Sequence, residues 1–256
     1  GKAQSNQFAS SSVVAANYAT LRDRGLDKVA SPFDIRHSFK ANWLYELPFG
    51  RGRMFFTDAN GLVDKVLGGW EFHGAWRAQS GTPFNLGNVQ LVGMDKRELQ
   101  DAVEIRNHPA GPVFFLPDDI ILNTQRAFNT TATGFSLGAP TGRYIAPAGS
   151  NGCVPGYAGQ CGFTNLVLYG PKFNRWDLSI VKKIRFTETA NLEFRTELLN
   201  AFNNINFKVG SAGNTVTSVT NFSASTFGRT TTAYQDISTT NDPGARMVQF
   251  VMRLNF

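Results

Sequence analysis

Apolar and polar residues alternate along five segments of the chain. From 39 to 47 the odd positions are apolar or aromatic and the even positions are mostly polar, with Leu44 as the exception. Successive side chains of a β-strand point to opposite faces, so this alternation predicts a strand with one apolar face and one polar face. The same alternation recurs at 70–78, 176–186, 192–202 and 248–256, and Lys182 interrupts it within the third segment. The pattern therefore predicts five strong strands.

Short connections and a short helix are predicted between some of these strands. TETA at 187–190 separates the third and fourth segments and predicts a tight turn. In the longer connection 49–69, GLVDKVLGG ends in two glycines, which is typical of a short helix. Within 192–202, Phe194, Leu198 and Phe202 also have helical spacing, so a helix remains the alternative for that segment.

Aromatic side chains gather near the ends of the predicted strands. Membrane barrels carry Trp, Tyr and Phe in girdles at the two membrane interfaces, with lipid outside and water inside. A closed barrel also satisfies every backbone N–H and C=O group in hydrocarbon. We therefore expect an all-β fold of antiparallel transmembrane barrel strands, with an aromatic girdle that includes Trp43, Tyr45, Trp70, Trp76 and Trp176.

The polar sides of the strands carry charges of both signs. In a barrel these side chains would face the aqueous lumen, and they include Lys40, Glu71, Arg77, Arg175, Asp177, Arg195 and Glu197. One interpretation is that they form salt bridges between neighbouring strands. The other is that some of them bind a solute or a plug inside the barrel. The functional surface would then be the inner face and the external loops.

The lengths of the connections predict which side of the membrane each one lies on. Outer-membrane barrels have short periplasmic turns and longer external loops. If the last strand ends on the periplasmic side, TETA is a periplasmic turn, and the stretches 85–173 and 208–245 are external. The connection 49–69 would be periplasmic, although it is longer than such turns usually are.

Composition narrows the class of protein. The chain has 256 residues, of which 12% are aromatic and 17% are charged, unlike a disordered chain or a helical bundle. No apolar run reaches the roughly 18 residues of a transmembrane helix. The net charge of +6 comes from scattered basic residues, so we expect no nucleic acid partner. Cys153 and Cys161 predict a disulfide formed in an oxidising compartment, and two buried free thiols are the alternative.

The sequence contains no motif typical of a catalytic or metal site. His37, His73 and His108 lie far apart, and nucleophile and phosphate-binding motifs are missing. The adjacent acids Asp118 and Asp119 are expected to lie in a loop. We therefore expect no enzyme activity, no metal ion and no cofactor.

Six motifs follow one another in order from about residue 30 to the C-terminus. They are DIRHSFKANWLYELPFGRGR, GGWEFHGAWRAQSGTPF, the AFN at 127–129, GPKFNRWDLSIVKKIRFTETANLEFRTELLNAFNNINF, FGRTTTA and VQFVMRLNF. Together they resemble the C-terminal part of TonB-dependent outer-membrane receptors of the Oar-like type. The resemblance implies a barrel of about 22 strands in outer-membrane lipid, with external loops, in a Gram-negative-type cell. It also implies an N-terminal plug and uptake of a scarce solute with energy from an inner-membrane complex.

The last strand carries a further resemblance. Phe250, Met252, Leu254 and Phe256 alternate with polar or smaller residues and resemble the signal that the barrel assembly machinery reads. Five strong strands are too few for the implied barrel. We therefore expect 1–256 to be the C-terminal segment of one larger barrel domain, without its plug and N-terminal sandwich domain, which transports nothing alone. The alternatives are a secreted or surface β-sandwich that binds carbohydrate or mediates adhesion, and a small autonomous structural outer-membrane barrel.

Overall fold

The chain divides into two compact units. The computed structural model describes residues 4–5, 22–109, 111–150, 152–154, 156, 160–187, 189–209, 220–233 and 244–256. The first unit, here called the core unit, comprises Gly1–His37, Gln79–Lys172 and Phe207–Tyr234. The second, the strand unit, comprises Ser38–Ala78, Phe173–Asn206 and Gln235–Phe256.

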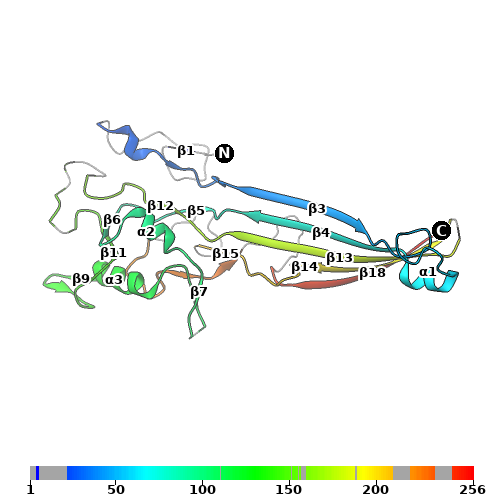
Figure 1. Ribbon diagram of the computed structural model, residues 1–256. Helices are drawn as coiled ribbons and strands as arrows, with labels where there is room; N and C mark the ends of the chain where they lie inside the picture. Colours follow the sequence, from blue (N-terminus) through cyan, green and yellow to red (C-terminus); the bar gives the residue numbers. More distant parts are fainter. Residues whose placement is uncertain are drawn as a thin grey trace. The chain divides into compact units, whose positions relative to one another are not determined.

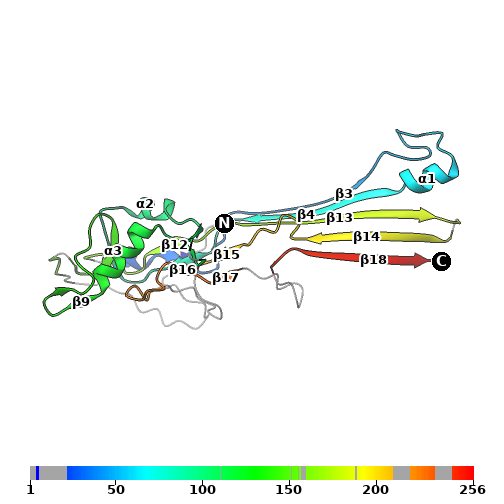
Figure 2. The same ribbon diagram turned by 90° about the horizontal axis from the view of Figure 1, so that it is seen from below.

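The described part of the strand unit is a single five-stranded sheet with one short helix. Its elements are β3 (Ser38–Glu46), α1 (Gly61–Leu67), β4 (Trp70–Gln79), β13 (Phe173–Arg185), β14 (Asn191–Leu199) and β18 (Met247–Asn255). The strand order is β18-β14-β13-β4-β3, and Figures 1 and 2 show the five strands running side by side. The C-terminus and α1 lie at the same end of this sheet (Figures 1 and 2). All five strands predicted from the alternation are therefore confirmed.

The turn and the short helix predicted between strands are also confirmed. The Phe186 amide donates to the Ala190 carbonyl at 3.0 Å, and the antiparallel pairing of β13 with β14 begins directly beyond this turn, at Arg185 and Asn191. Helix α1 begins after Asn60, whose side chain accepts a hydrogen bond from the Val63 amide. Asparagine is a favoured N-cap because its oxygen satisfies a free N–H of the first turn.

The helical alternative for 192–202 is wrong. Residues of β14 pair with β13 on one side and with β18 on the other, so Leu198 lies opposite both Leu178 and Val248. The strand ends at Leu199, and the next residue, Asn200, has a φ of 50° and is almost fully buried. Its side-chain amide donates to the carbonyls of Asn204 and Gly244. Two flanking strands thus outweigh the helical spacing of three apolar residues.

The described residues of the core unit form short strands and three helical segments. Its elements are β1 (Gln4–Ser5), the 3-10 helix η1 (Arg24–Asp27), β2 (Val29–Ala30), β5 (Pro83–Asn85), β6 (Val89–Val92), α2 (Lys96–Asp101), β7 (Arg106–Asn107), β8 (Val113–Phe114), α3 (Asp118–Phe128), β9 (Thr130–Thr131), β10 (Gly134–Phe135), β11 (Tyr144–Pro147), β12 (Val167–Tyr169), β15 (Phe207–Lys208), β16 (Arg229–Thr230) and β17 (Thr232–Ala233). Small antiparallel pairings join them, such as β11 with β6 and β12 with β5.

Nearly all of the buried hydrophobic side chains belong to the core unit. Its main cluster is built from several of these short elements and includes Phe84, Leu99, Phe115, Ile120, Ile145, Leu166, Phe222 and Phe227. Of the buried hydrophobic residues in the described chain, Val181 alone lies in the strand unit. The stretch 85–173 is therefore largely a folded body that supplies most of this core and is not simply a loop, while its predicted external location stays a prediction.

The prediction that Asp118 and Asp119 lie in a loop is wrong. They form the first turn of α3, where carboxylates are stabilised by the exposed N–H groups and the positive end of the helix. Part of the predicted connection 208–245 lies outside the described residues, namely 210–219 and 234–243. Its described part supplies β16 and β17, together with Phe222 and Phe227 of the core.

Candidate functional site: the two faces of the five-stranded sheet

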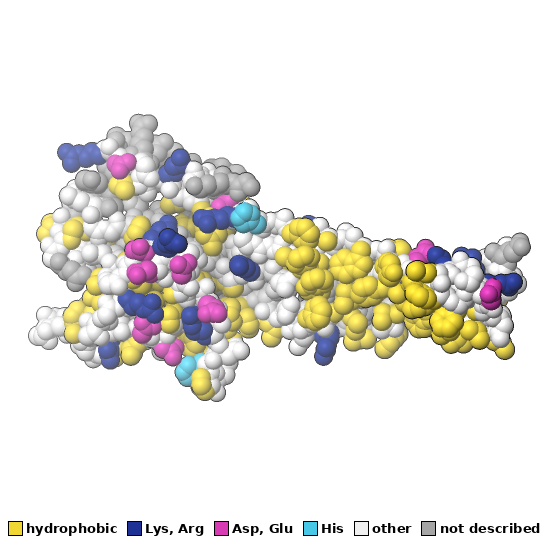
Figure 3. Space-filling model, in the orientation of Figure 1, with side chains coloured by type: hydrophobic (Ala, Val, Ile, Leu, Met, Phe, Trp, Pro, Cys, Tyr) yellow, Lys and Arg dark blue, Asp and Glu magenta, His cyan; other side chains and the backbone are white. Residues whose placement is uncertain are grey.

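One face of the sheet is apolar, and much of it is exposed. The register aligns Leu192, Phe194 and Leu198 of β14 with apolar residues of β18, namely Leu254, Met252 and Val248. Phe250 is 78% exposed, and Phe256, just beyond β18, is 96% exposed. A large apolar surface of this kind is costly in water and marks contact with lipid or another protein. Figure 3 shows hydrophobic side chains gathered over the strands.

Aromatic rings cluster on this face at the end of the sheet away from α1. The rings of Trp76 and Trp176 are stacked with centroids 4.8 Å apart, and Trp43 meets Trp176 edge-on at 6.0 Å. Phe39 and Phe202 extend the cluster at 4.8 Å from Trp76 and 5.8 Å from Trp176. The structure thus brings together three of the five predicted girdle residues.

The remaining girdle residues lie toward the α1 end of the sheet. Tyr45 is near the end of β3 and Trp70 begins β4, where its indole N–H donates to the Val66 carbonyl at 3.0 Å. Phe186, just after β13, lies ten positions beyond Trp176. At about 3.3 Å per residue and a tilt of about 40°, ten positions span about 25 Å, the height of the apolar band of a membrane barrel. Trp176 and Phe186 are therefore separated by about the height of that band, whereas Tyr45 lies only two positions from Trp43 on β3.

The opposite face of the sheet carries a network of ion pairs. Lys183 Nζ lies 2.6 Å from Glu71 Oε1, and His73 Nε2 lies 2.9 Å from Glu71 Oε2. On β14, Arg195 lies 3.0 Å from Glu193 and 3.4 Å from Glu197. These residues share one face, because Lys183 is opposite Glu193 in the register. The polar face therefore forms a largely charge-paired surface suited to water.

Asp177 holds a second group on the same face. Its carboxylate lies 2.9 Å from Arg175 Nε and 3.8 Å from Arg77 Nη2, and it also accepts the Asn200 amide at 2.8 Å. Lys40 of β3 is exposed and forms no ion pair within the described part of the chain. Of the seven residues predicted to face the lumen, six therefore take part in ion pairs, which supports the salt-bridge interpretation of this face.

Sequence reasoning did not select Lys183, His73 and Glu193 as site residues, although all three take part in this network. The pairing of Lys183 with Glu193 could have been predicted from the tight turn at 187–190. Once Arg185 is paired with Asn191 across that turn, counting two residues back along each strand places Lys183 opposite Glu193. His73 could be found only from the geometry, because nothing in the sequence states which way its ring turns.

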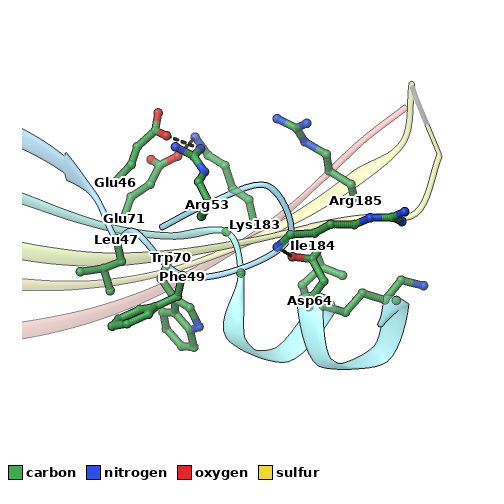
Figure 4. Close-up of a pocket in the computed structure, with 15 residues that line it drawn as sticks. Glu46, Leu47, Phe49, Arg53, Asp64, Trp70, Glu71, Lys183, Ile184 and Arg185 are labelled. Carbon is green, nitrogen blue, oxygen red and sulfur yellow. Dashed lines mark hydrogen bonds and ion pairs between the residues drawn. The ribbon is translucent and has the colours of Figure 1, made fainter. Parts of the chain in front are cut away.

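A pocket of about 430 Å³ lies at the α1 end of the sheet (Figure 4). Half of its charged lining is ion-paired, since Arg53 bonds Glu46 at 2.5 Å and Lys183 bonds Glu71. The Asp64 carboxylate accepts the Arg51 amide at 2.6 Å. Figure 4 shows Glu46, Glu71, Arg53 and Lys183 on one side of the sheet and Trp70, Phe49 and α1 on the other.

The core unit contains the cysteine pair and a group of polar contacts around Tyr169. Cys153 and Cys161 form a disulfide in the structure. The Tyr169 hydroxyl donates to the buried Asp34 carboxylate at 2.6 Å, and the Arg36 guanidinium lies 3.9 Å above the tyrosine ring. Burial, reinforced by the hydrogen bond to Asp34, raises the pKa of Tyr169.

A further ion pair links α3 to the segment before β11. Arg143 Nε donates to Asp119 Oδ2 at 2.7 Å, and this hydrogen bond lowers the pKa of Asp119. Among the described residues, no three His, Cys, Asp or Glu side chains are grouped so that they could hold a metal ion. No helix in the described part of the chain is long and apolar enough to cross a membrane.

Taken together, the two faces define the class of this protein. The strand unit presents apolar and aromatic side chains on one side and paired charges on the other. Among its described residues, nothing but the short helix α1 at one end covers the apolar side. Such a sheet belongs with lipid on one face and water on the other, as in membrane β-barrels. A β-sandwich would instead bury the tryptophan-bearing face in a dry core.

Comparison with protein families agrees with this class. The model of a family described as an outer membrane beta barrel domain matches residues 1–249, so the chain belongs to that family. Membership indicates the outer membrane as its location. No match was found among the curated proteins or among the solved structures. The described strands do not close into a barrel, because β18 and β3 remain the edges of the sheet.

Proposed function

We propose that this chain supplies C-terminal strands of a TonB-dependent, Oar-like outer-membrane receptor that takes up a scarce solute. The observation that carries the proposal is the open, two-faced sheet, whose edges β3 and β18 both remain available for pairing. Unpaired N–H and C=O groups cannot stay in hydrocarbon, so further strands must close the barrel. The ordered motifs described above favour the Oar-like receptors as the family that provides them.

The polar face suits the lumen of such a receptor. Its ion pairs hold charged side chains in place along β4, β13 and β14, and leave a hydrated wall against which a plug could lie. The proposal gives the chain no catalytic step, no metal and no cofactor. Its partners are outer-membrane lipid, the barrel assembly machinery, the plug, the inner-membrane complex that supplies energy, and the solute.

The alternating side chains of β18 support the proposed role of the last strand in assembly. Phe250, Met252 and Leu254 all project exposed apolar side chains from an edge strand. An exposed edge of this kind can add to another strand, either in the assembly machinery or at the barrel seam. The core unit would then lie on the external side, where an oxidising environment suits the disulfide.

Uptake measurements in the organism that carries the gene test the proposal. Cells are supplied with a defined mixture of peptides, chelated iron and oligosaccharides, and depletion of each compound is followed by mass spectrometry. Loss of the gene should abolish depletion of one compound class, and loss of the inner-membrane energy complex should abolish the same depletion. Depletion that is unaffected by either loss would contradict the proposal.

The size of the native protein provides a second test. Antibodies against the core unit should detect, in outer-membrane fractions, a protein much larger than 28.1 kDa whose gel mobility changes on boiling. A heat-modifiable band near 28.1 kDa would instead indicate a small autonomous barrel. A band that leaves the membrane without detergent would contradict both kinds of barrel.

A further inference from the structure

The connection between β3 and β4 exposes an unusual amount of apolar surface. Helix α1 has no buried residue, and Leu62 and Val66 are 78% and 66% exposed. These two residues are four positions apart, so they share one face of the helix. Met54, Phe55 and Phe56, earlier in the same connection, are also exposed. Soluble proteins seldom leave so many large apolar side chains together without a partner.

Helix α1 lies on the apolar side of the sheet. Figure 4 shows the helix with Trp70, on the side opposite Glu71 and Lys183. The Trp70 indole donates to the Val66 carbonyl at 3.0 Å, and Lys182 Nζ donates to the same carbonyl at 3.1 Å and to the Gly68 carbonyl. Three hydrogen bonds therefore fasten the C-terminal end of α1 to the strands.

Lys182 explains why a helix is needed at this position. It is the one basic residue on the apolar side of β13, where the register places it opposite Phe194. Its side chain is nevertheless buried, because the last carbonyls of α1 surround the ammonium group and Trp70 lies beneath it. The C-terminal end of a helix carries a partial negative charge that favours a cation. The helix thus shields a charge that lipid would otherwise meet.

The exposed face of α1 is continuous with the lipid-facing surface of the strands. Lys65 Nζ lies 5.9 Å from the ring centre of Phe186, which follows β13 on the apolar side. Figure 3 shows hydrophobic side chains continuing along the strands to the end at which α1 lies. Arg51, Lys65 and Arg185 have no carboxylate at ion-pair distance among the described residues. The end of the sheet therefore combines apolar side chains with unpaired cations.

We propose that the connection 47–69 is an interfacial membrane anchor that docks on phospholipid. Leu62 and Val66 enter the acyl region, and Arg51 and Lys65 meet anionic headgroups at the edge of the bilayer. Amphipathic helices with basic residues beside an apolar face bind membranes in this manner. This inference rests on the proposed membrane placement of the sheet, and it accounts for a connection longer than an ordinary turn.

Spin labelling in vesicles tests the inference without disturbing the fold. Leu62→Cys, Asp58→Cys and Phe250→Cys are prepared singly in the complete receptor that carries this chain, so that the barrel can close, and each variant is labelled and reconstituted in vesicles of phosphatidylethanolamine and phosphatidylglycerol. The label at position 62 should be accessible to oxygen and shielded from a water-soluble nickel reagent, as at position 250, whereas position 58 should be open to the reagent. A label at 62 as open to the reagent as that at 58 would overturn the anchor.

The same experiment separates the anchor from the proposed function. If position 250 is also open to the reagent, the membrane placement of the sheet is wrong, and the anchor is overturned with it. If position 62 lies in lipid while uptake does not depend on the inner-membrane complex, the anchor stands and only the transport proposal is lost.

A pair of double variants measures the contribution of the anchor to insertion. Leu62→Asp with Val66→Asp should reduce the fraction of protein that inserts into these vesicles several-fold, as read from gel mobility without boiling. Leu137→Asp with Val154→Asp is the matched control, because both residues are exposed in the core unit. Equal insertion of the two variants would contradict the anchor.

Discussion

A single glycine decides where the Trp43 indole lies. Gly74 is in the interior of β4, and a Cβ atom at this position would overlap the six-membered ring of Trp43. Glycine inside a strand often marks such a close approach, since any other residue would fill the space. The absence of one methyl group thus lets the indole of Trp43 pass close to the β4 backbone and reach Trp176 in the aromatic cluster.

Gly74→Ala should destabilise the folded protein by about 1–3 kcal/mol, because overpacking displaces the indole. Unfolding by urea in vesicles measures the change, and Trp43→Leu in the same chain should restore part of the loss. Gly61→Ala is the control, since no atom lies within 4 Å of its added Cβ and alanine favours a helix. The explanation is wrong if Gly61→Ala lowers the free energy of unfolding as much as Gly74→Ala does, or if Trp43→Leu restores none of the stability that Gly74→Ala loses.

At the level of elements, the register between strands creates the polar network. Glu71 lies on β4 and Lys183 on β13, so these two residues are far apart in the sequence and meet only because the strands pair. The pair is partly buried, with side-chain exposures of 11% and 40%. A charge removed from such a position leaves its partner poorly solvated, so the pair should contribute more than an exposed salt bridge.

Glu71→Lys should destabilise the sheet by about 1–3 kcal/mol, between the values typical of exposed and buried pairs. It places a second positive charge beside Lys183 and removes the carboxylate that His73 contacts. The double variant Glu71→Lys with Lys183→Glu should recover much of this loss in a double-mutant cycle measured by urea unfolding. If the double variant loses as much as the sum of the single changes, the two side chains are not coupled.

A second contact between elements joins β13 to α1 through the side chain of Lys182. Lys182→Met keeps the length of the side chain but removes the hydrogen bonds to the Val66 and Gly68 carbonyls. Amide hydrogen exchange over 61–68 should become faster, while the strands keep their protection because methionine is tolerated on a lipid-facing surface. Lys40→Met, on the polar side of β3, is the control and should leave α1 unchanged. Unaltered exchange in α1 after Lys182→Met would show that Lys182 does not hold the helix.

The whole molecule combines a unit with a buried core and a unit without one. Core-unit side chains such as Phe84 and Phe115 are almost fully buried, whereas the described strand unit buries little apart from Val181 and a few polar residues. A sheet of this length gains stability only if its apolar face leaves water, since hydrophobic burial is the main favourable term in folding. The chain belongs to a family of outer-membrane barrel domains, and the lipid bilayer provides that environment for such a domain.

Neighbouring residues on β18 test this assignment of faces. Phe250→Arg should destabilise the protein in vesicles by up to about 2–4 kcal/mol, the cost of a basic residue on the lipid side near mid-depth. Gln249→Arg, one position earlier and on the opposite face, should have little effect. Unfolding of both variants in urea measures the difference, and similar values for the two would refute the assignment of faces.

The alternation of residues was sufficient to predict each of the five long strands and the two faces of the sheet. The short TETA stretch predicted the turn, and the paired glycines of GLVDKVLGG predicted the helix. These features depend on neighbours in sequence, because the side-chain period of two and the turn residues act locally. The sequence resemblance went further, to a receptor class, whereas the family comparison shows the coarser outer-membrane barrel domain. Lys182 looked like an interruption of the pattern until the position of α1 explained it.

Two features depended on contacts between residues distant in sequence. The stretch 85–173 folds around a core shared with Phe222 and Phe227, and its short strands are too brief to leave a readable alternation. The polar residues could be assigned to one face from the sequence, but which carboxylate meets which cation follows from strand register. Sequence alone therefore determined the local conformation and the polarity of each strand, and the tertiary structure decided the partners, because partners are chosen by pairing and packing across the chain.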